Sequence, residues 1–205
     1  MKIKLVNARL SFADLFTPKS INGGNLKFSG TFIASDDTKI KFTKENGEEV
    51  MVSHTRLKDV GDKVLSEKFG KIPPKVDNWL YNKADGSTTR GAFTNSEGEY
   101  WAGFTADTFY VSAGKKEADC PNGELHVIDQ RCQKVEANSG LIHSGVYVDA
   151  VIDVYAHDGG SGKCLTGQLI GVQLRSAGEA LGSAPMNAAD EFEEIEIEVD
   201  EDPNF

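Results

Sequence analysis

The sequence has little of what disulfide frameworks and membrane proteins need. Only three of its 205 residues are cysteine, and no two of them form a Cys-x-x-Cys pair, so a disulfide-rich secreted protein is not expected. No apolar run approaches the roughly 20 residues that cross a bilayer. The N-terminus also lacks the apolar stretch and cleavage site of a signal peptide. These absences predict a cytoplasmic protein that does not contact a membrane.

Motifs of catalysis and cofactor binding are missing as well. The chain has no P-loop, no Gly-x-Gly-x-x-Gly opening a helix, no His-Glu-x-x-His and no Gly-x-Ser-x-Gly. Four possible zinc ligands are spaced more widely than the close pairs of structural zinc sites, which favours buried or incidental thiols; these are Cys120, His126, Cys132 and His143. We therefore expect no enzyme, no cofactor and no metal.

One pair of carboxylates keeps a metal-dependent nuclease open as an alternative. Asp149 and Asp153 fall on the same face of a predicted strand, where two carboxylates could hold a metal ion. A solvated strand face explains the same spacing without any chemistry, and it is the favoured interpretation.

The net charge of −10 argues at first against a nucleic-acid partner, but the charge is unevenly distributed. Residues 190–205 hold nine acidic and no basic side chains, which leaves residues 1–189 with 22 basic and 23 acidic side chains, a net of −1. Within that part, residues 1–90 carry 16 basic against 11 acidic side chains, whereas residues 91–189 carry 6 against 12. The first half can therefore present a basic surface.

Hydrophobic alternation predicts a mainly β protein. Strand patterns occur in 2–12, 26–35, 99–113, 125–135, 143–157 and 165–176. The expected core positions in them are Phe28, Phe32, Val146, Val148, Ala150, Ile152, Val154, Ile170, Val172 and Leu174. Residues 54–71 have helical spacing instead, and Pro73-Pro74 ends that helix. These elements predict a small antiparallel barrel or sandwich with one inserted helix.

The chain divides into three predicted parts. Residues 1–176 form the folded domain, and residues 177–189 are a linker of small residues. Residues 190–205 are an acidic tail that we expect to be disordered when free. Apolar residues interrupt its acids, as in segments that dock onto basic, partly apolar surfaces.

Basic and aromatic side chains interleave along the folded part. Proteins that bind single strands without sequence preference hold the phosphates with basic side chains and stack the bases on exposed rings, worth about 1–3 kcal/mol per base. Candidates for the phosphates are Arg9, Lys27, Lys39, Lys41, Lys83, Arg90, Lys115 and Lys116. Candidates for stacking are Trp79, Tyr81, Tyr100, Trp101, Tyr147 and Tyr155. For each of them, ordinary exposure of the charge or burial of the ring is the alternative.

The acidic tail either improves solubility or binds a partner. Its candidate partner-binding residues are Glu193, Glu194, Glu196, Glu198, Asp200, Glu201, Asp202 and Phe205. The linker lets these residues reach a basic surface. A terminal aromatic ring beside a carboxylate can also enter an apolar pocket flanked by basic residues, which favours the partner-binding alternative.

Three stretches resemble the OB-fold single-stranded DNA-binding proteins of phages, a family related in architecture to the tailed protein of phage T7. Asn7-Ala-Arg-Leu-Ser-Phe12 resembles the family's start, and Ser144-Gly-Val-Tyr-Val-Asp-Ala150 its late central strand. Leu169-Ile-Gly-Val-Gln173 resembles its closing strand. Asp149 departs from the Asn that is common in the family, which argues against a DNA contact on that strand face.

The resemblance implies an OB-like barrel that binds single-stranded DNA in phage replication or recombination, inside the bacterial host cell. It also implies a tail that competes with DNA for the basic surface and recruits replication proteins such as a polymerase or a helicase. A homo-oligomer is compatible with it. The alternative from another class is a non-enzymatic virion or assembly protein whose tail binds a partner.

Overall fold

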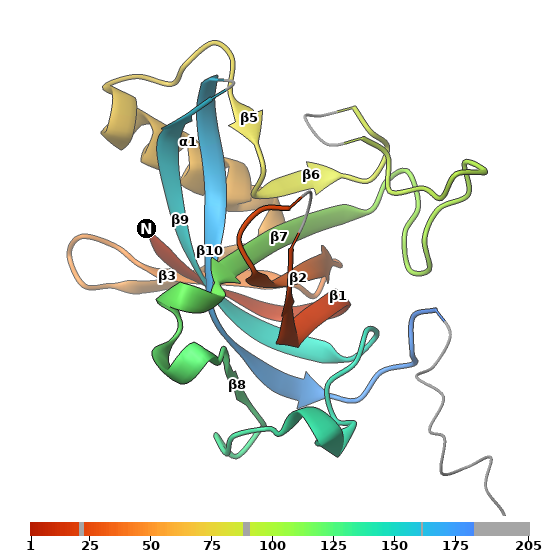
Figure 1. Ribbon diagram of the computed structural model, residues 1–205. Coiled ribbons are helices and arrows are strands. Elements are labelled where there is room, and N and C mark those ends of the chain that lie inside the picture. The colour runs from red at the N-terminus through yellow and green to blue at the C-terminus, as the bar shows by residue number, and fades with distance from the viewer. Residues whose placement is uncertain (21–22, 88–90, 161, 183–205) are drawn as a thin grey trace, which may run out of the picture.

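The computed structural model describes residues 1–20, 23–87, 91–160 and 162–182 (Figure 1). The strands of these residues are β1 (Lys2–Lys19), β2 (Lys27–Ala34), β3 (Lys39–Thr43), β4 (Glu49–Ser53), β5 (Asp77–Asn78), β6 (Tyr81–Lys83), β7 (Phe109–Lys116), β8 (His126–Ile128), β9 (Tyr147–Gly159) and β10 (Gly162–Ser176). The helical elements among them are the α-helix α1 (Leu57–Phe69) and the 3₁₀ turns η1 (His54–Arg56), η2 (Glu117–Asp119), η3 (Pro121–Gly123) and η4 (Ala137–Ser139).

Five of the strands close into a barrel. β1 pairs with β2, β2 with β7, and β9 with both β10 and β1, all of them antiparallel. β7 and β10 run parallel and pair at Gly114 and Gln168, which completes the ring. A five-stranded barrel of this kind is the architecture of the OB-fold. The predicted mainly β, OB-like barrel with one inserted helix is therefore confirmed.

The barrel interior is filled by the residues that alternation predicts. Phe28 and Phe32 of β2 are 2% and 0% exposed, and Val146, just before β9, and the even-numbered residues from Val148 to Val154 on β9 are buried as well. Because the side-chain period of a strand is two, the intervening residues face away from the core. The two faces of β2 and β9 are thereby assigned.

Ile170 of β10 is an exception among the predicted core residues. Val172 and Leu174 are buried, but Ile170 is only half-buried. The pairing of β10 with β9 shifts register between Leu169 and Gly171, and the extra residue of such a bulge is left without a partner. The inward positions pass from odd-numbered to even-numbered residues at this point, which the sequence pattern does not reveal.

The inserted helix α1 covers one end of the barrel (Figure 1). Its apolar side chains join the barrel core, and Gly61 allows the close approach, because a Cβ at this position would lie 2.8 Å from Cδ2 of Leu165. The helix ends at Gly70, which has a left-handed φ of 74°, just before Pro73-Pro74. The predicted helix is confirmed. No helix among the described residues is long and apolar enough to cross a membrane.

Two of the strand predictions were wrong over most of their length. In the segment 99–113 only the part within β7 is a strand, because Gly98 and Gly103 adopt positive φ angles of 83° and 85° and turn the chain. In the segment 125–135 only β8 is a strand, and Cys132 lies in a turn with a φ of 60°. Aromatic and β-branched residues in these segments pack on the barrel from loops, so their composition resembles that of strands.

Candidate nucleic-acid interface

β1, β2 and β7 lie side by side, and their outward residues form three rows across the barrel (Figure 1). Residues opposite each other in an antiparallel pair share one face of the sheet. The pairing places together Ser11–Thr31–Ser112, Asp14–Ser29–Gly114 and Lys19–Lys27–Lys116. We call the first two rows the polar strip and the third the basic row.

The polar strip consists of small side chains apart from Asp14. Ser11, Thr31 and Ser112 are 4%, 7% and 8% exposed, and the hydroxyl oxygens of Thr31 and Ser112 lie 3.4 Å apart. The carboxylate of Asp14 forms an ion pair with Lys19 at 2.6 Å. Because these three hydroxyl side chains are buried, a ligand on this face contacts the groups around them, such as Asp14, Lys19 and the neighbouring rings, more than the hydroxyls themselves.

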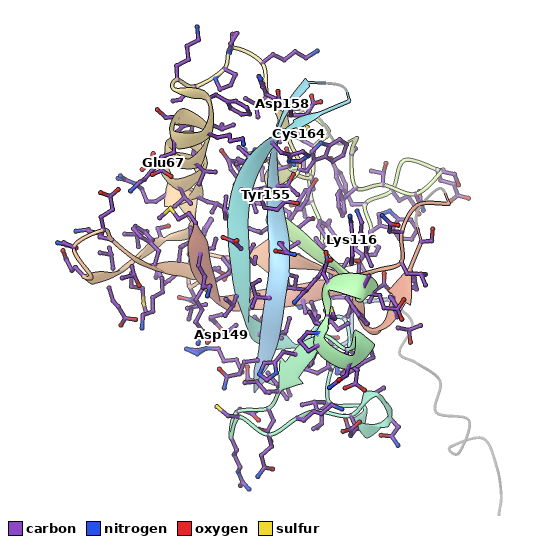
Figure 2. All side chains as sticks on the ribbon, turned by 60° about the vertical axis from the view of Figure 1, so that its left-hand side comes forward. Glu67, Lys116, Asp149, Tyr155, Asp158 and Cys164 are labelled. Atoms are coloured by element: carbon purple, nitrogen blue, oxygen red, sulfur yellow. The ribbon has the colours of Figure 1, made fainter. Side chains whose placement is uncertain are left out.

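The basic row brings three lysines from three strands together. Lys27 lies opposite Lys19 on one side and opposite Lys116 on the other, and Figure 2 shows Lys116 at the end of β7. Like charges directly opposite each other on neighbouring strands are destabilising. Among the described residues, only Lys19 of the three has an ion-pair partner. The row therefore favours an anionic ligand, which would relieve this repulsion.

An aromatic cluster borders the polar strip on the side away from the basic row. It consists of Phe12, Phe93, Trp101, Phe104 and Tyr110. Tyr110 lies two residues before Ser112 on β7, and Lys116 lies four residues after it, so the cluster and the basic row are on opposite sides of the strip. Rings and charges therefore flank a strip of small residues.

The cluster has a buried base and an exposed rim. Phe104 and Tyr110 are 5% and 0% exposed, and the ring centres of Phe93 and Phe104 are 4.7 Å apart in a stacked pair. Phe12 is 42% and Trp101 48% exposed, with ring centres 6.2 Å apart at 82°. Because edge-to-face contacts hold these two rings, they present exposed surface with little freedom to lose on binding.

Trp79 lies at the far edge of β7, between β7 and β10. Its backbone N–H donates to the carbonyl of Leu165 on β10, and the N–H of Ser112 on β7 donates to the carbonyl of Leu80. The indole is 39% exposed. Tyr155 of β9 is 41% exposed. The pKa of its hydroxyl is raised, mainly by partial burial and secondly by the negative charge of Asp153. Trp79 thus has a partly exposed ring, and its neighbour Leu80 is hydrogen-bonded to Ser112 of the polar strip.

Three of the other predicted residues lie on β6 or in the loop before β7, outside the aromatic cluster: Tyr81, Lys83 and Tyr100. Tyr81 stacks on Phe109 with ring centres 5.6 Å apart, and burial raises its pKa to about 12. Lys83 lies 3.4 Å from a carboxylate oxygen of Asp107. Tyr100 is 39% exposed beside Trp101. Tyr81 therefore presents less free ring surface than Trp79 or Trp101.

Arg9 and Tyr147 lie where the chain leaves the barrel. The Arg9 guanidinium donates to the carbonyls of Gly145 at 3.2 Å and Glu179 at 2.9 Å, and Tyr147 pairs with Arg9 across β1 and β9. Residues 177–182, which we call the exit segment, run past this point. Leu181 reaches the loop before β7, since a Cβ on Gly103 of that loop would lie 2.9 Å from the Leu181 side chain. These contacts direct the chain along the edge of the cluster.

The remaining predicted residues lie away from the three rows. Lys39 and Lys41 are on β3, where Lys41 forms an ion pair with Glu49 at 2.7 Å. Lys115 lies opposite Phe28, whose side chain is in the core, so the side chains of Lys115 and Lys116 are on opposite faces of the sheet. Lys115 lines a separate cavity of about 430 Å³. Arg90 and the predicted tail residues lie outside the described residues.

Lys19 and Phe12 belong to this surface, although the sequence did not indicate them. Lys19 joins the basic row only through the pairing of β1 with β2. Phe12 has a φ of 47° in an irregular part of β1, which turns its ring outward from a strand that alternation assigns to the core. A Pro-Lys sequence at the end of β1 was the one available signal, and it is not specific.

The two aspartates considered for a nuclease have structural partners. The Asp149 carboxylate lies 2.9 Å from Lys4, is 3.7 Å from Arg175, and accepts a hydrogen bond from the N–H of Asn7 at 3.0 Å (Figure 2). Asp153 forms an ion pair with the N-terminal amine of Met1 at 3.0 Å. In the part of the chain that the structure describes, no three His, Cys, Asp or Glu side chains are arranged to bind a metal.

Comparisons with known proteins place the chain in a family. The family model described as the single-stranded DNA-binding protein of Enterobacter phage Enc34 matches residues 1–203. "Putative protein p50" of Acyrthosiphon pisum secondary endosymbiont phage 1 is 28% identical over 203 residues, 98% of each chain.

The solved Enc34 protein superposes with a TM-score of 0.58 at 17% identity, covering 94% of this chain and 90% of that one. Its complex with single-stranded DNA gives 0.59 at 18% identity, covering 88% and 89%. The chain belongs to the family of the phage Enc34 single-stranded DNA-binding protein, a non-catalytic family of OB-like fold.

Proposed function

We propose that this chain binds single-stranded DNA across the outer face of β1, β2 and β7, without strong sequence preference. The basic row neutralises phosphates, and the exposed rings of Phe12 and Trp101 stack on bases. The observation that carries the proposal is the arrangement of lysines and exposed rings on opposite sides of the polar strip.

The ligand is a single strand because stacking on a protein ring requires an unpaired base, whereas bases inside a duplex already stack on one another. In the polar strip, the hydroxyls of Ser11, Thr31 and Ser112 are buried and Asp14 is paired with Lys19, which is consistent with weak sequence preference. The Enc34 relative was solved in complex with single-stranded DNA, and this supports the class of ligand.

We also propose that the acidic tail competes with DNA for this face and, once displaced, recruits replication proteins such as a polymerase or a helicase. Residues 190–205 carry nine acidic side chains, opposite in charge to the basic row. The exit segment runs along the edge of the aromatic cluster, so the chain beyond it starts close to the proposed DNA site. A tail starting there has a high effective concentration at that site.

Gel shifts with single-stranded and duplex DNA test both parts of the proposal. The full chain should retard oligo-dT at lower protein concentration than a duplex of equal length. A chain shortened to residues 1–189 should bind oligo-dT more tightly, and the gain should shrink with added salt, because salt screens the tail's charge.

A chain of full length with the acidic residues of 190–205 changed to Gln or Asn controls for the loss of length, and it should match the shortened chain. Equal affinities of full and shortened chains at low salt would contradict the competition. Equal affinity for single-stranded and duplex DNA would contradict the proposed function itself.

A further inference from the structure

A cavity of about 420 Å³ opens between the end of α1, the loop after it and the start of β10. A cavity of this volume can hold part of an organic ligand. Its apolar wall consists of Phe69, Pro73 and Pro74, and its charged lining of Lys71, Lys75, Asp77 and Lys163. None of these residues belongs to the polar strip, the basic row or the aromatic cluster.

The charges around the cavity favour an anion. Lys71 and Lys75 are exposed, and no ion pair joins either of them to an acidic side chain among residues 1–20, 23–87, 91–160 and 162–182. Lys163 is already paired with Asp158, and its Nζ lies 4.4 Å from the centre of the Phe69 ring. Lys71 and Lys75 are thus the two ammonium groups left for a ligand.

Two features oppose an anion here, and their summed negative charge is smaller than the summed positive charge of Lys71 and Lys75. Asp77 also lines the cavity, and the end of α1 carries a partial negative charge of about half a unit. Lys68, in the last turn of α1, offsets the charge of the helix end. The positive potential of Lys71 and Lys75 therefore prevails at the mouth of the cavity.

The cavity adjoins the proposed DNA site through β5. Asp77 and Asn78 pair with Cys164 and Leu165 of β10, and Trp79 follows directly. Trp79 thus lies two residues, about 7 Å along the strand, beyond Asp77 of the cavity lining, and the carbonyl of its neighbour Leu80 accepts a hydrogen bond from the N–H of Ser112 in the polar strip. Figure 1 shows β5 and β6 leading from the loop after α1 towards β7. A ligand that leaves the strip over Trp79 reaches the cavity directly.

We propose that this cavity is a second binding site for single-stranded DNA, entered from the polar strip over the Trp79 ring. Lys71 and Lys75 contact phosphates, and a base lies against the apolar wall formed by Pro73 and Pro74. The inference rests on the proposed function and extends its footprint. A flexible single strand can follow this path, whereas a duplex, with a persistence length of about 150 base pairs, cannot bend sharply enough.

Full-length Lys71→Gln/Lys75→Gln protein, compared with the wild type, tests the proposal with fluorescein-labelled oligo-dT of increasing length. Short oligomers that occupy only the strip should bind both proteins equally. For longer oligomers the affinity gained with length should be smaller in the variant by about five- to tenfold at low salt, because two phosphate contacts are lost. The matched control is Lys2→Gln/Arg131→Gln, which removes two exposed charges outside the cavity and should follow the wild type.

The outcomes separate this inference from the proposed function. If the double variant follows the wild type at every length, the second site is wrong, while the strip is tested independently by Lys27→Gln/Lys116→Gln with the shortest oligomer. If that strip variant binds the shortest oligomer normally, the proposed function fails instead. A variant that keeps its DNA affinity but loses binding of a peptide of residues 190–205 would overturn the inference in favour of an acidic peptide.

Discussion

Replacing Gly145 by alanine should lower the free energy of unfolding by about 2–5 kcal/mol. Gly145 has a φ of 118°, a conformation that costs an L-residue about 1–3 kcal/mol. A Cβ at this position would also lie 2.0 Å from the carbonyl oxygen of Glu179, so the exit segment must move. Arg9 donates to the same carbonyl and would lose that acceptor. Both effects add to the strain.

Urea unfolding followed by tryptophan fluorescence measures this change, and the melting temperature should fall by about 5–15 °C for a chain of this size. Gly160→Ala is the matched control, because a Cβ there has no atom within 4 Å and the φ is not left-handed. A Gly145→Ala protein as stable as the Gly160→Ala protein would show that the exit segment is not packed against the barrel as described.

Replacing Trp101 by alanine should weaken the binding of oligo-dT by about 1–3 kcal/mol, the cost of losing one stacked base. This corresponds to an affinity about 5- to 150-fold lower. Trp101 is 48% exposed and is held edge-on by Phe12, so the ring is positioned before DNA arrives. Phe12→Ala should weaken binding in the same way.

Fluorescence anisotropy with labelled oligo-dT measures the effect, and urea unfolding checks that each variant is folded. Tyr100→Ala is the matched control, since Tyr100 is an exposed neighbouring ring outside the aromatic cluster. The proposed stacking would be contradicted if Trp101→Ala bound oligo-dT like the wild type, or if Tyr100→Ala lost more affinity than Trp101→Ala.

The barrel and its helix could be predicted because their patterns are local. The alternation along β9 and the spacing of apolar residues in α1 each lie within one segment. The bulge at Ile170 could not be predicted, because it depends on how β10 pairs with β9. The loop before β7 was misassigned because its aromatic residues pack in a cluster that turns at Gly98 and Gly103 make possible.

The candidate site was only partly predictable for the same reason. Lys27, Lys116 and Trp101 can be selected from residue type alone, because that choice does not depend on which strands pair. Their neighbours Lys19 and Phe12 come from β1, and only the register of β1 with β2 brings them to the same surface. Asp149, in contrast, was indicated by residue type for a nuclease site, but the structure places it against Lys4 and the N–H of Asn7.

The salt dependence of oligo-dT binding tests most directly whether the basic row holds the phosphates. Lys27→Gln/Lys116→Gln should reduce the slope of log affinity against log salt by about 1.4, or about 0.7 for each lost phosphate contact. Lys39→Gln/Lys41→Gln removes the same charge from β3, outside the three rows, and should keep the wild-type slope. A reduced slope in the β3 variant together with a wild-type slope in the basic-row variant would contradict the account.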